Sequence, residues 1–290
     1  TKNLSEGIFK KWIALLIQKN SKTATSIALD LSQFFYCRQD ARYSLPEDLG
    51  IILLTHPSLF TPSKEHSETM RDYNWSRMAK WFIRQYPGRS LELAKVMLER
   101  FGQDGTIVKD SHGSPVEVLN IIVEKFPEKV WNEIKKYLGP PIDSRAFDIT
   151  HWLRGDEFSR GKGSKGGILP LIPLNKLWAW VDEDVKKRAW YLTSMVPKSL
   201  FMEQDRVCLA REVLVRYGDR KDVKNELMAN FSTEGWTGPE SSHLQGKKEY
   251  LLKFRAEETN KNVQRWIDEY VAIIDKEFKH AQIREEREGF

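Results

Sequence analysis

A short run rich in glycine and lysine is the part of the sequence closest to a phosphate-binding element. It reads Arg160-Gly-Lys-Gly-Ser-Lys-Gly-Gly167. A Walker A loop needs Gly-Lys followed by Ser or Thr, between a strand and a helix, so that amides and Lys surround the phosphates. Here Gly163 follows the Gly-Lys pair, and no strand pattern precedes it. We therefore predict a flexible loop between helices. A weaker role stays open for Arg160, Lys162 and Lys165 in contacting a phosphate backbone or an acidic partner.

Arg145 and His151 form the one pair whose types and spacing fit acid–base chemistry on a phosphate. A His can transfer a proton, and an Arg can stabilise the negative charge that develops. With five residues between them, the pair is similar to the Arg–His motif of HEPN-type ribonucleases, and this resemblance implies RNA cleavage. That family usually has a polar residue directly after the Arg, whereas here Ala146 follows it. We favour a helix-surface pair and assign no catalytic residue.

Other signatures of chemistry do not occur in the sequence. The histidines carry no His-Glu-x-x-His word, there is no Cys-x-x-Cys pair, and no Gly-x-Ser-x-Gly word marks a hydrolase nucleophile. We therefore expect no metal and no cofactor. The two cysteines, Cys37 and Cys208, cannot form a disulfide framework and lie in apolar surroundings in the sequence. We expect both to be buried, in a protein of the cytoplasm.

Tryptophan is unusually frequent, with 10 residues in 290. Trp178 and Trp180 flank Ala179, so they cannot both face one core from the same helix, and Trp236 lies in a Gly-containing loop. An exposed Trp can anchor a protein partner or stack on a base, so these three are candidate binding residues. Burial of Trp236 against the terminal helices is the alternative. Five further tryptophans fall on apolar stripes and are predicted to be core: Trp12, Trp81, Trp131, Trp190 and Trp266.

The charge balance excludes a strongly basic protein. Lys and Arg number 46 against 41 Asp and Glu, which gives a net charge of +5. The basic clusters are small and interleaved with acids, which is typical of solvated helix faces, although binding to nucleic acid stays open. No apolar run approaches the length of a membrane span, so we expect no membrane insertion.

Helical periodicity covers nearly every segment that has a readable pattern. Prolines begin or break several of these segments: Pro115 starts one helix and Pro127 ends it. No alternating strand pattern occurs, so the sequence predicts an all-α protein. The main helical segments are 4–19, 67–86, 91–101, 128–138, 184–196, 206–217, 222–231 and 260–288.

Two similar words recur in these helices. Leu93-Ala94-Lys95 leads to Arg100-Phe101-Gly102, and Leu209-Ala210-Arg211 leads to Arg216-Tyr217-Gly218. Their separation is about three periods of the ~40 residues found in two-helix repeats, and each Gly is expected to be a left-handed helix cap. The helix-pair organisation resembles a HEAT- or armadillo-type α-solenoid.

The segment from Arg216 to Tyr270 is also similar to the tails of large bacterial multidomain proteins, some of them defence factors. This resemblance supplies no catalytic residue. The chain begins with Thr1 rather than Met, so we expect it to be the C-terminal part of a longer protein.

The predicted organisation is therefore an irregular α-α superhelix of stacked helix pairs with a long C-terminal capping helix. Residues 1–155 and 171–290 form its two helical-repeat parts, joined by a flexible Gly/Lys-rich loop at 156–170. The predicted function is that of a non-enzymatic scaffold or sensor which binds a protein partner, binds other domains of its own chain, or oligomerises. Nucleic-acid binding is the first alternative and a HEPN-type ribonuclease the second. Nucleic acid would need cations from several helices on one surface, whereas a protein partner would need an exposed apolar or mixed patch.

Overall fold

The described part of the chain consists of helices. The structure is a computed structural model that describes residues 6–36, 45–60, 67–102, 115–139, 142–155, 167–196, 208–232 and 236–288. These ranges contain 14 α-helices, a few short 3₁₀ turns and no strand. The prediction of an all-α protein is confirmed for this part of the chain.

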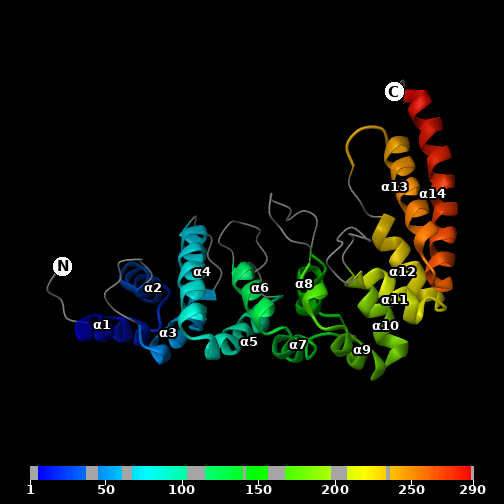
Figure 1. Ribbon diagram of the computed structural model, residues 1–290. Coiled ribbons are helices and arrows are strands. Elements are labelled where there is room, and N and C mark those ends of the chain that lie inside the picture. Colours follow the sequence, from blue (N-terminus) through cyan, green and yellow to red (C-terminus); the bar gives the residue numbers. More distant parts are fainter. Residues whose placement is uncertain are drawn as a thin grey trace. The chain divides into compact units, whose positions relative to one another are not determined.

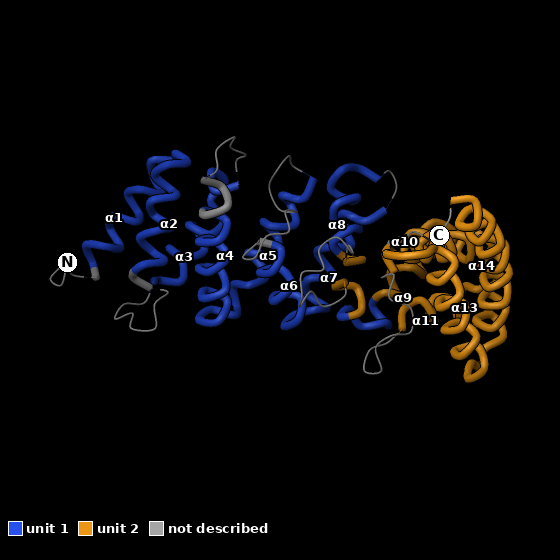
Figure 2. Tube along the Cα trace, turned by 90° about the horizontal axis from the view of Figure 1, so that it is seen from above, with its two compact units in different colours: residues 1–152, 156–162, 171–176 blue, residues 153–155, 163–170, 177–290 orange. Residues whose placement is uncertain are grey.

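The chain divides into two compact units (Figure 2). Unit 1 contains the described residues up to Trp152 together with Leu171–Lys176. Unit 2 contains Leu153–Gly155 and the described residues from Gly167 onward, apart from Leu171–Lys176. The boundary falls inside two helices, α8 (Ser144–Arg154) and α9 (Leu174–Asp182). The predicted loop at 156–170 lies between α8 and α9. Its described end is packed against the protein, since Ile168 and Leu169 are buried.

The helices of unit 1 form two rows. Helices α1 to α7 each contact helices one or two positions away in the chain, and the pairs two apart are α2 with α4, α4 with α6, α3 with α5, and α5 with α7. Even-numbered helices therefore stack on one another, as do odd-numbered ones, and Figure 1 shows the two rows. The helices are α1 (Glu6–Gln18), α2 (Lys22–Tyr36), α3 (Glu47–Leu54), α4 (Ser67–Gln85), α5 (Ser90–Arg100), α6 (Pro115–Lys125), α7 (Pro127–Ile134) and α8.

Polar side chains link each helix from α2 to α7 to the one two positions along. Such contacts fix how far one helix is shifted along its neighbour, which the apolar contacts alone leave loosely defined. In the even row the contacts are Asn74 Nδ2 to Asp30 Oδ1 at 2.8 Å, Lys80 to Glu117, and Trp152 Nε1 to Asn120 Oδ1 at 2.8 Å. In the odd row they are Arg89 to Asp48 at 3.0 Å, Lys95 to Glu133 at 3.7 Å, and Lys176 to Glu128 at 3.0 Å.

A hydrophobic residue followed by proline begins each odd-numbered helical segment from α3 to α9. The four pairs are Leu45-Pro46, Tyr86-Pro87, Phe126-Pro127 and Ile172-Pro173, and their prolines are 41, 40 and 46 residues apart. Proline fits a helix start because its fixed φ suits the first turn and its missing N–H needs no partner there. It also holds the preceding residue extended, which separates one helix from the next. Two of these pairs touch, because the Tyr86 hydroxyl donates to the Leu45 carbonyl at 2.7 Å.

Unit 2 follows the pattern of unit 1 in part. Helix α10 contacts α12, two positions along, whereas α14 contacts α11, three positions away, and packs along α13. Polar contacts again accompany them: Arg216 to Asp182 joins α11 to α9 at 2.7 Å, and Lys224 to Glu269 joins α12 to α14 at 2.7 Å. Besides the C-terminal part of α9, the helices are α10 (Val185–Ser194), α11 (Leu209–Tyr217), α12 (Lys221–Ser232), α13 (Glu240–Glu257) and α14 (Lys261–Glu288).

The longest helix, α14, buries one side and exposes the other. An apolar stripe is buried along most of its length, and α11 and α13 cover it. Phe278, the last member of the stripe, is half-buried. The buried members are Val263, Trp266, Ile267, Tyr270 and Ile274.

The two recurring words run along odd-numbered helices, α5 and α11, which are three helix pairs apart in the sequence. Phe101 and Tyr217, which precede the final glycines, are both buried. Gly102 has φ +74° and is a left-handed cap, as expected. Gly218 has φ −70°, so the prediction of a left-handed cap was wrong there. A side chain at Gly218 would collide with Leu214 and Asn262, so close packing accounts for this glycine.

Replacing Trp266 by Ala is expected to destabilise unit 2 strongly. The side chain is fully buried and its Nε1 donates to the Lys224 carbonyl at 3.2 Å. Lost burial and the cavity should lower the free energy of unfolding by about 3–5 kcal/mol. Chemical denaturation of Trp266→Ala beside Trp236→Ala provides the measurement, since Trp236 is exposed. Equal stabilities of the two variants would contradict burial of Trp266.

Candidate functional site

The outer side of the even-numbered helices in unit 1 carries exposed aromatic and aliphatic side chains. Ile27 and Phe34 on α2, and Tyr73 on α4, are between 42% and 56% exposed. They lie opposite the buried side of each helix, which on α2 is formed by Ala28 and Leu29. The contact between Asp30 and Asn74 places these parts of α2 and α4 side by side.

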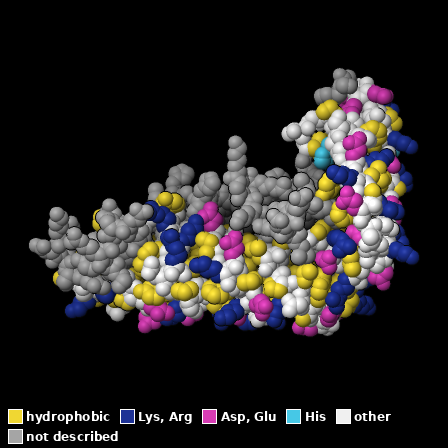
Figure 3. Space-filling view, in the orientation of Figure 1, with side chains coloured by type: hydrophobic (Ala, Val, Ile, Leu, Met, Phe, Trp, Pro, Cys, Tyr) yellow, Lys and Arg dark blue, Asp and Glu magenta, His cyan; other side chains and the backbone are white. Residues whose placement is uncertain are grey.

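Basic residues interleave with the aromatic ones along α4. Tyr73, Arg77, Trp81 and Arg84 follow at intervals of four, four and three residues, which places them on one side of the helix. The Arg77 guanidinium lies 5.6 Å from the centre of the Tyr73 ring, and Arg84 Nε donates to the Lys80 carbonyl at 3.2 Å. Figure 3 shows Lys and Arg side chains gathered over α4.

These two arginines differ from their neighbour Lys80 in having no carboxylate partner among the described residues. Lys80 pairs with Glu117 of α6, whereas Arg77 and Arg84 form no ion pair there. An exposed guanidinium beside an aromatic ring can bind a carboxylate or a phosphate of another molecule. We call Ile27, Phe34, Tyr73, Arg77 and Arg84 the α2–α4 face.

Acidic as well as basic side chains lie around the α2–α4 face. Asp30 on α2 contacts Asn74 of α4, and Glu117 on α6 contacts Lys80 of α4. Figure 3 shows acidic side chains next to the basic ones. The unpaired cations of this face thus come from α4 alone in the described ranges.

Arg145 and His151 point in different directions from α8. Six residues along a helix correspond to about 9 Å and a net rotation of about 120°. Arg145 Nε donates to the Phe101 carbonyl at 3.3 Å, and its guanidinium lies 5.2 Å from the Tyr137 ring centre. The His151 ring lies 4.3 Å from that of Phe147, which is exposed. The two side chains therefore contact different neighbours.

The basic residues of the Gly/Lys-rich run, Arg160, Lys162 and Lys165, lie outside the described residues. Its last glycine, Gly167, is described. A side chain at Gly167 would collide with the backbone of Leu153 and Arg154 at the end of α8. This glycine is accordingly explained by close backbone packing rather than by an approaching phosphate.

The three tryptophans predicted to bind a partner have different environments. Trp180 is 2% exposed and packs against Tyr191 and Arg188, so it belongs to the core rather than to a surface. Trp178 is half-buried under Arg216, whose guanidinium lies 5.3 Å away. Trp236 is exposed and its ring stacks on His243 at 5.3 Å with an interplanar angle of 11°. Trp178 and Trp180 thus face different sides, as their spacing predicted.

Helical periodicity placed the other tryptophans in the core, and this was correct for some of them. Trp131 and Trp266 are buried, whereas Trp12 and Trp190 are exposed, so the prediction was wrong for the latter two. Trp81 is half-buried. The indole N–H of Trp190 donates to Glu226 at 2.9 Å, which accounts for its position at the edge of α10.

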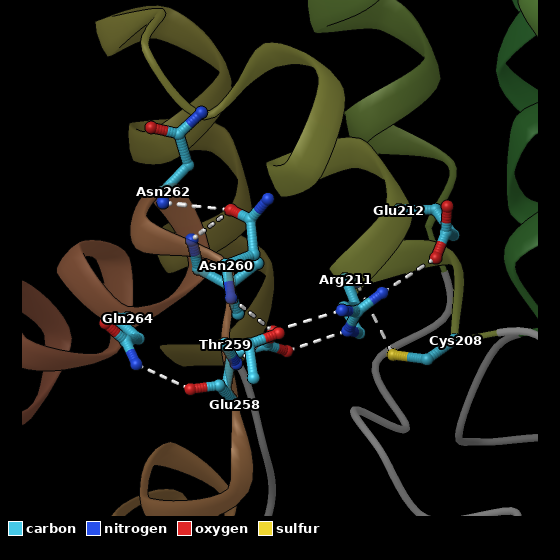
Figure 4. A network of polar contacts seen from close by, with 9 residues as sticks. Cys208, Arg211, Glu212, Glu258, Thr259, Asn260, Asn262 and Gln264 are labelled. Atoms are coloured by element: carbon cyan, nitrogen blue, oxygen red, sulfur yellow. Dashed lines mark hydrogen bonds and ion pairs between the residues drawn. The ribbon is translucent and has the colours of Figure 1, made fainter.

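A buried ion pair ties α11 to the turn between α13 and α14 (Figure 4). Glu258 accepts from Arg211 Nε at 2.7 Å and Nη2 at 3.0 Å, and from the backbone N–H groups of Thr259 and Asn260. The carboxylate is 2% exposed, and these four donors occupy its acceptor sites. Burial raises the pKa of Glu258, but the hydrogen bonds from Arg211 and the backbone outweigh it and hold the pKa below its usual value. The cluster therefore holds α11 against the turn between α13 and α14, and it is not a ligand site.

Cys208 lies next to this cluster. Its Sγ accepts the Arg211 N–H at 3.5 Å, so the residue is the N-cap of α11 and is only half-buried. The prediction that Cys208 is buried inside a helix was therefore wrong. Cys37 lies outside the described residues.

The described part of the chain contains neither a cluster of metal-binding side chains nor a helix that could span a membrane. In these ranges no three His, Cys, Asp or Glu side chains are placed to hold a metal ion. None of the described helices combines the length and apolar content that a bilayer crossing requires. Comparison of the chain with protein-family models, with curated proteins and with solved structures finds no match.

Replacing Glu258 by Gln is expected to destabilise unit 2 by about 2 kcal/mol at neutral pH, because the buried side of the Arg211 ion pair is lost while Glu212 still pairs with Arg211 at 3.1 Å. The pKa of Glu258 is lowered, so its stabilising contribution is present above the unfolded pKa of about 4.3 and disappears as the pH falls through the folded pKa. Urea denaturation at pH 7 and at pH 3 tests this. The exposed pair of Asp268 and Arg255 provides the control, because Asp268→Asn should cost less than about 1 kcal/mol. A pH-independent difference between wild type and Glu258→Gln would contradict the assignment.

Replacing Glu226 by Gln is expected to have the opposite effect. Burial raises the pKa of Glu226, although the Trp190 N–H and the nearby Arg154 counteract it. A raised pKa means that stability is present below the unfolded pKa and is lost as the pH rises through the folded pKa. Glu226→Gln keeps an acceptor for the Trp190 N–H and cannot ionise, so it does not lose stability as the pH rises. Its melting temperature at pH 7 should therefore exceed that of wild type. The two proteins should converge at acidic pH, and a lower melting temperature of the variant at pH 7 would refute the argument.

Proposed function

We propose that the chain is a non-catalytic helical-repeat scaffold or sensor region of a HEAT-like α-solenoid, within a larger bacterial protein. What supports the repeat is the pattern of contacts between helices two apart in unit 1, together with the pair α10 and α12 in unit 2. The spacing of Pro46, Pro87, Pro127 and Pro173 at about 40 residues supports the same proposal. The charged outer side of α14 fits a helix that caps such an array.

The observation that carries the binding role is the composition of the α2–α4 face. Tyr, Trp and Arg contribute most to protein–protein binding energy, because each offers a large contact area together with a polar group. Here Tyr73 and Arg77 already lie against each other in the free protein, so little side-chain entropy is lost when a partner binds. The face is thus of the exposed, mixed kind that a protein partner requires.

Nucleic-acid binding is the weaker alternative. A phosphate backbone is best bound by cations from several helices, since each neutralised phosphate adds to the affinity. On this face α4 alone supplies unpaired arginines in the described ranges, and carboxylates of α2 and α6 contact Asn74 and Lys80 of the same helix. Those carboxylates would repel a phosphate backbone but could pair with basic groups of a protein.

Ribonuclease activity is the least supported of the three functions. The reaction needs Arg145 and His151 at one phosphate, and the two side chains leave α8 about 120° apart. A role in antiviral defence rests on the resemblance of the C-terminal segment alone.

Site-specific photo-crosslinking in cells tests the proposed scaffold function. A photoreactive residue at position 77 should crosslink to a partner protein, because Arg77 lies in the α2–α4 face. The same residue at position 92, on α5, is the control, because Glu92 pairs with Arg89 in the other row. Arg84→Glu in the same chain should weaken the crosslink at position 77 by about tenfold or more without changing the melting temperature.

The alternatives predict different results. Crosslinks to RNA or DNA at position 77, and a steep loss of oligonucleotide binding with salt, would establish nucleic-acid binding instead. RNA cleavage without added metal that disappears in His151→Ala would overturn the non-catalytic assignment.

A further inference from the structure

Helix α1 is apolar on two sides. Phe9, Ile13 and Ile17 are buried on the side next to α2. Ile8, Trp12 and Leu15 form a second stripe, and they are 38%, 45% and 57% exposed. Their spacing of four and three residues places all three on one side of the helix. We call Ile8, Trp12 and Leu15 the α1 outer stripe; it contains no residue of the α2–α4 face.

A helix that packs through one side needs no apolar residues on the other. Helix α12 is an example, because Lys221, Asp222 and Asn225 are exposed there and none of its large apolar side chains is exposed. Three adjacent large apolar side chains on α1 therefore indicate a surface that another molecule covers. Trp12 also has a fixed position, since its ring meets that of Phe9 edge-on at 5.8 Å.

The charge beside the stripe selects the partner. Lys11 is exposed at the edge of the α1 outer stripe and has no ion-pair partner among the described residues. A partner that carries a carboxylate at the matching position would satisfy it. A second copy of this chain fits less well, because an antiparallel two-fold pair about the middle of the stripe would bring the two Lys11 side chains together.

We propose that the α1 outer stripe binds an amphipathic α-helix of a partner protein, with Lys11 facing an acidic residue of that helix. The partner helix carries apolar residues at positions i, i+4 and i+7, which pack between Ile8, Trp12 and Leu15. This surface is separate from the α2–α4 face, and the proposal does not depend on what that face binds.

Two labelled helical peptides test the proposal by fluorescence anisotropy against the whole chain. Both carry leucines at i, i+4 and i+7; one has glutamates beside the leucines and the other has lysines. The glutamate peptide should bind about fivefold more tightly. Lys11→Glu should reverse that preference, and Trp12→Ala should weaken binding of the glutamate peptide by at least about tenfold. Phe34→Ala, on the α2–α4 face, is the matched control and should leave binding unchanged.

Several outcomes would overturn the proposal. Equal binding of the two peptides, or binding that Trp12→Ala leaves unchanged, would show that the stripe does not select an acidic helix. A clear drop in the melting temperature of Trp12→Ala would show that Trp12 is part of the core. Dimerisation on a sizing column that Trp12→Ala abolishes would identify a second copy of the chain as the occupant.

Discussion

The short helices of the described part of this protein have to be covered by their neighbours, because they are too short to be stable alone in water. Helices shorter than about 12–15 residues are marginal in isolation, and α3, α7, α9 and α11 have only 8 or 9 residues. Burial of an apolar stripe supplies the missing stability, and the contacts show where it comes from: the next helix and the helix two along. The two rows of unit 1 are the direct result of that requirement.

Apolar contacts alone would let neighbouring helices slide or rotate, and the polar links between helices two apart prevent this. Arg89 with Asp48 and Lys95 with Glu133 are partly exposed pairs, each of which contributes little to stability. Their main effect is on geometry, because each pair fixes the position of one helix along the next helix of its row. The prolines act with them: Phe126-Pro127 joins α6 to α7 directly, so the chain changes row within one residue.

The fold class could be predicted from the sequence because helical periodicity follows from burial of one side of each helix. The same periodicity placed Trp266 correctly and Trp12 wrongly. It identifies the apolar side of a helix, but it cannot tell whether another helix covers that side. On α1 both sides are apolar, so Trp12 appeared to be a core residue although it is exposed. The proline spacing was visible in the sequence but was missed, because each proline was interpreted singly as a helix start or stop.

The candidate surface could not be predicted from the sequence, since it depends on which charges are already paired. Arg77 and Arg89 look alike in sequence, yet Arg89 is held by Glu92 and Asp48 while Arg77 lies against Tyr73 without a carboxylate. An arginine that is already paired within the fold would have to give up that pair before it could bind another molecule. Arg77 has no such cost, and contact with Tyr73 already restricts its side chain. The availability of a charge, rather than the net charge of +5, therefore decides where this chain can bind a partner.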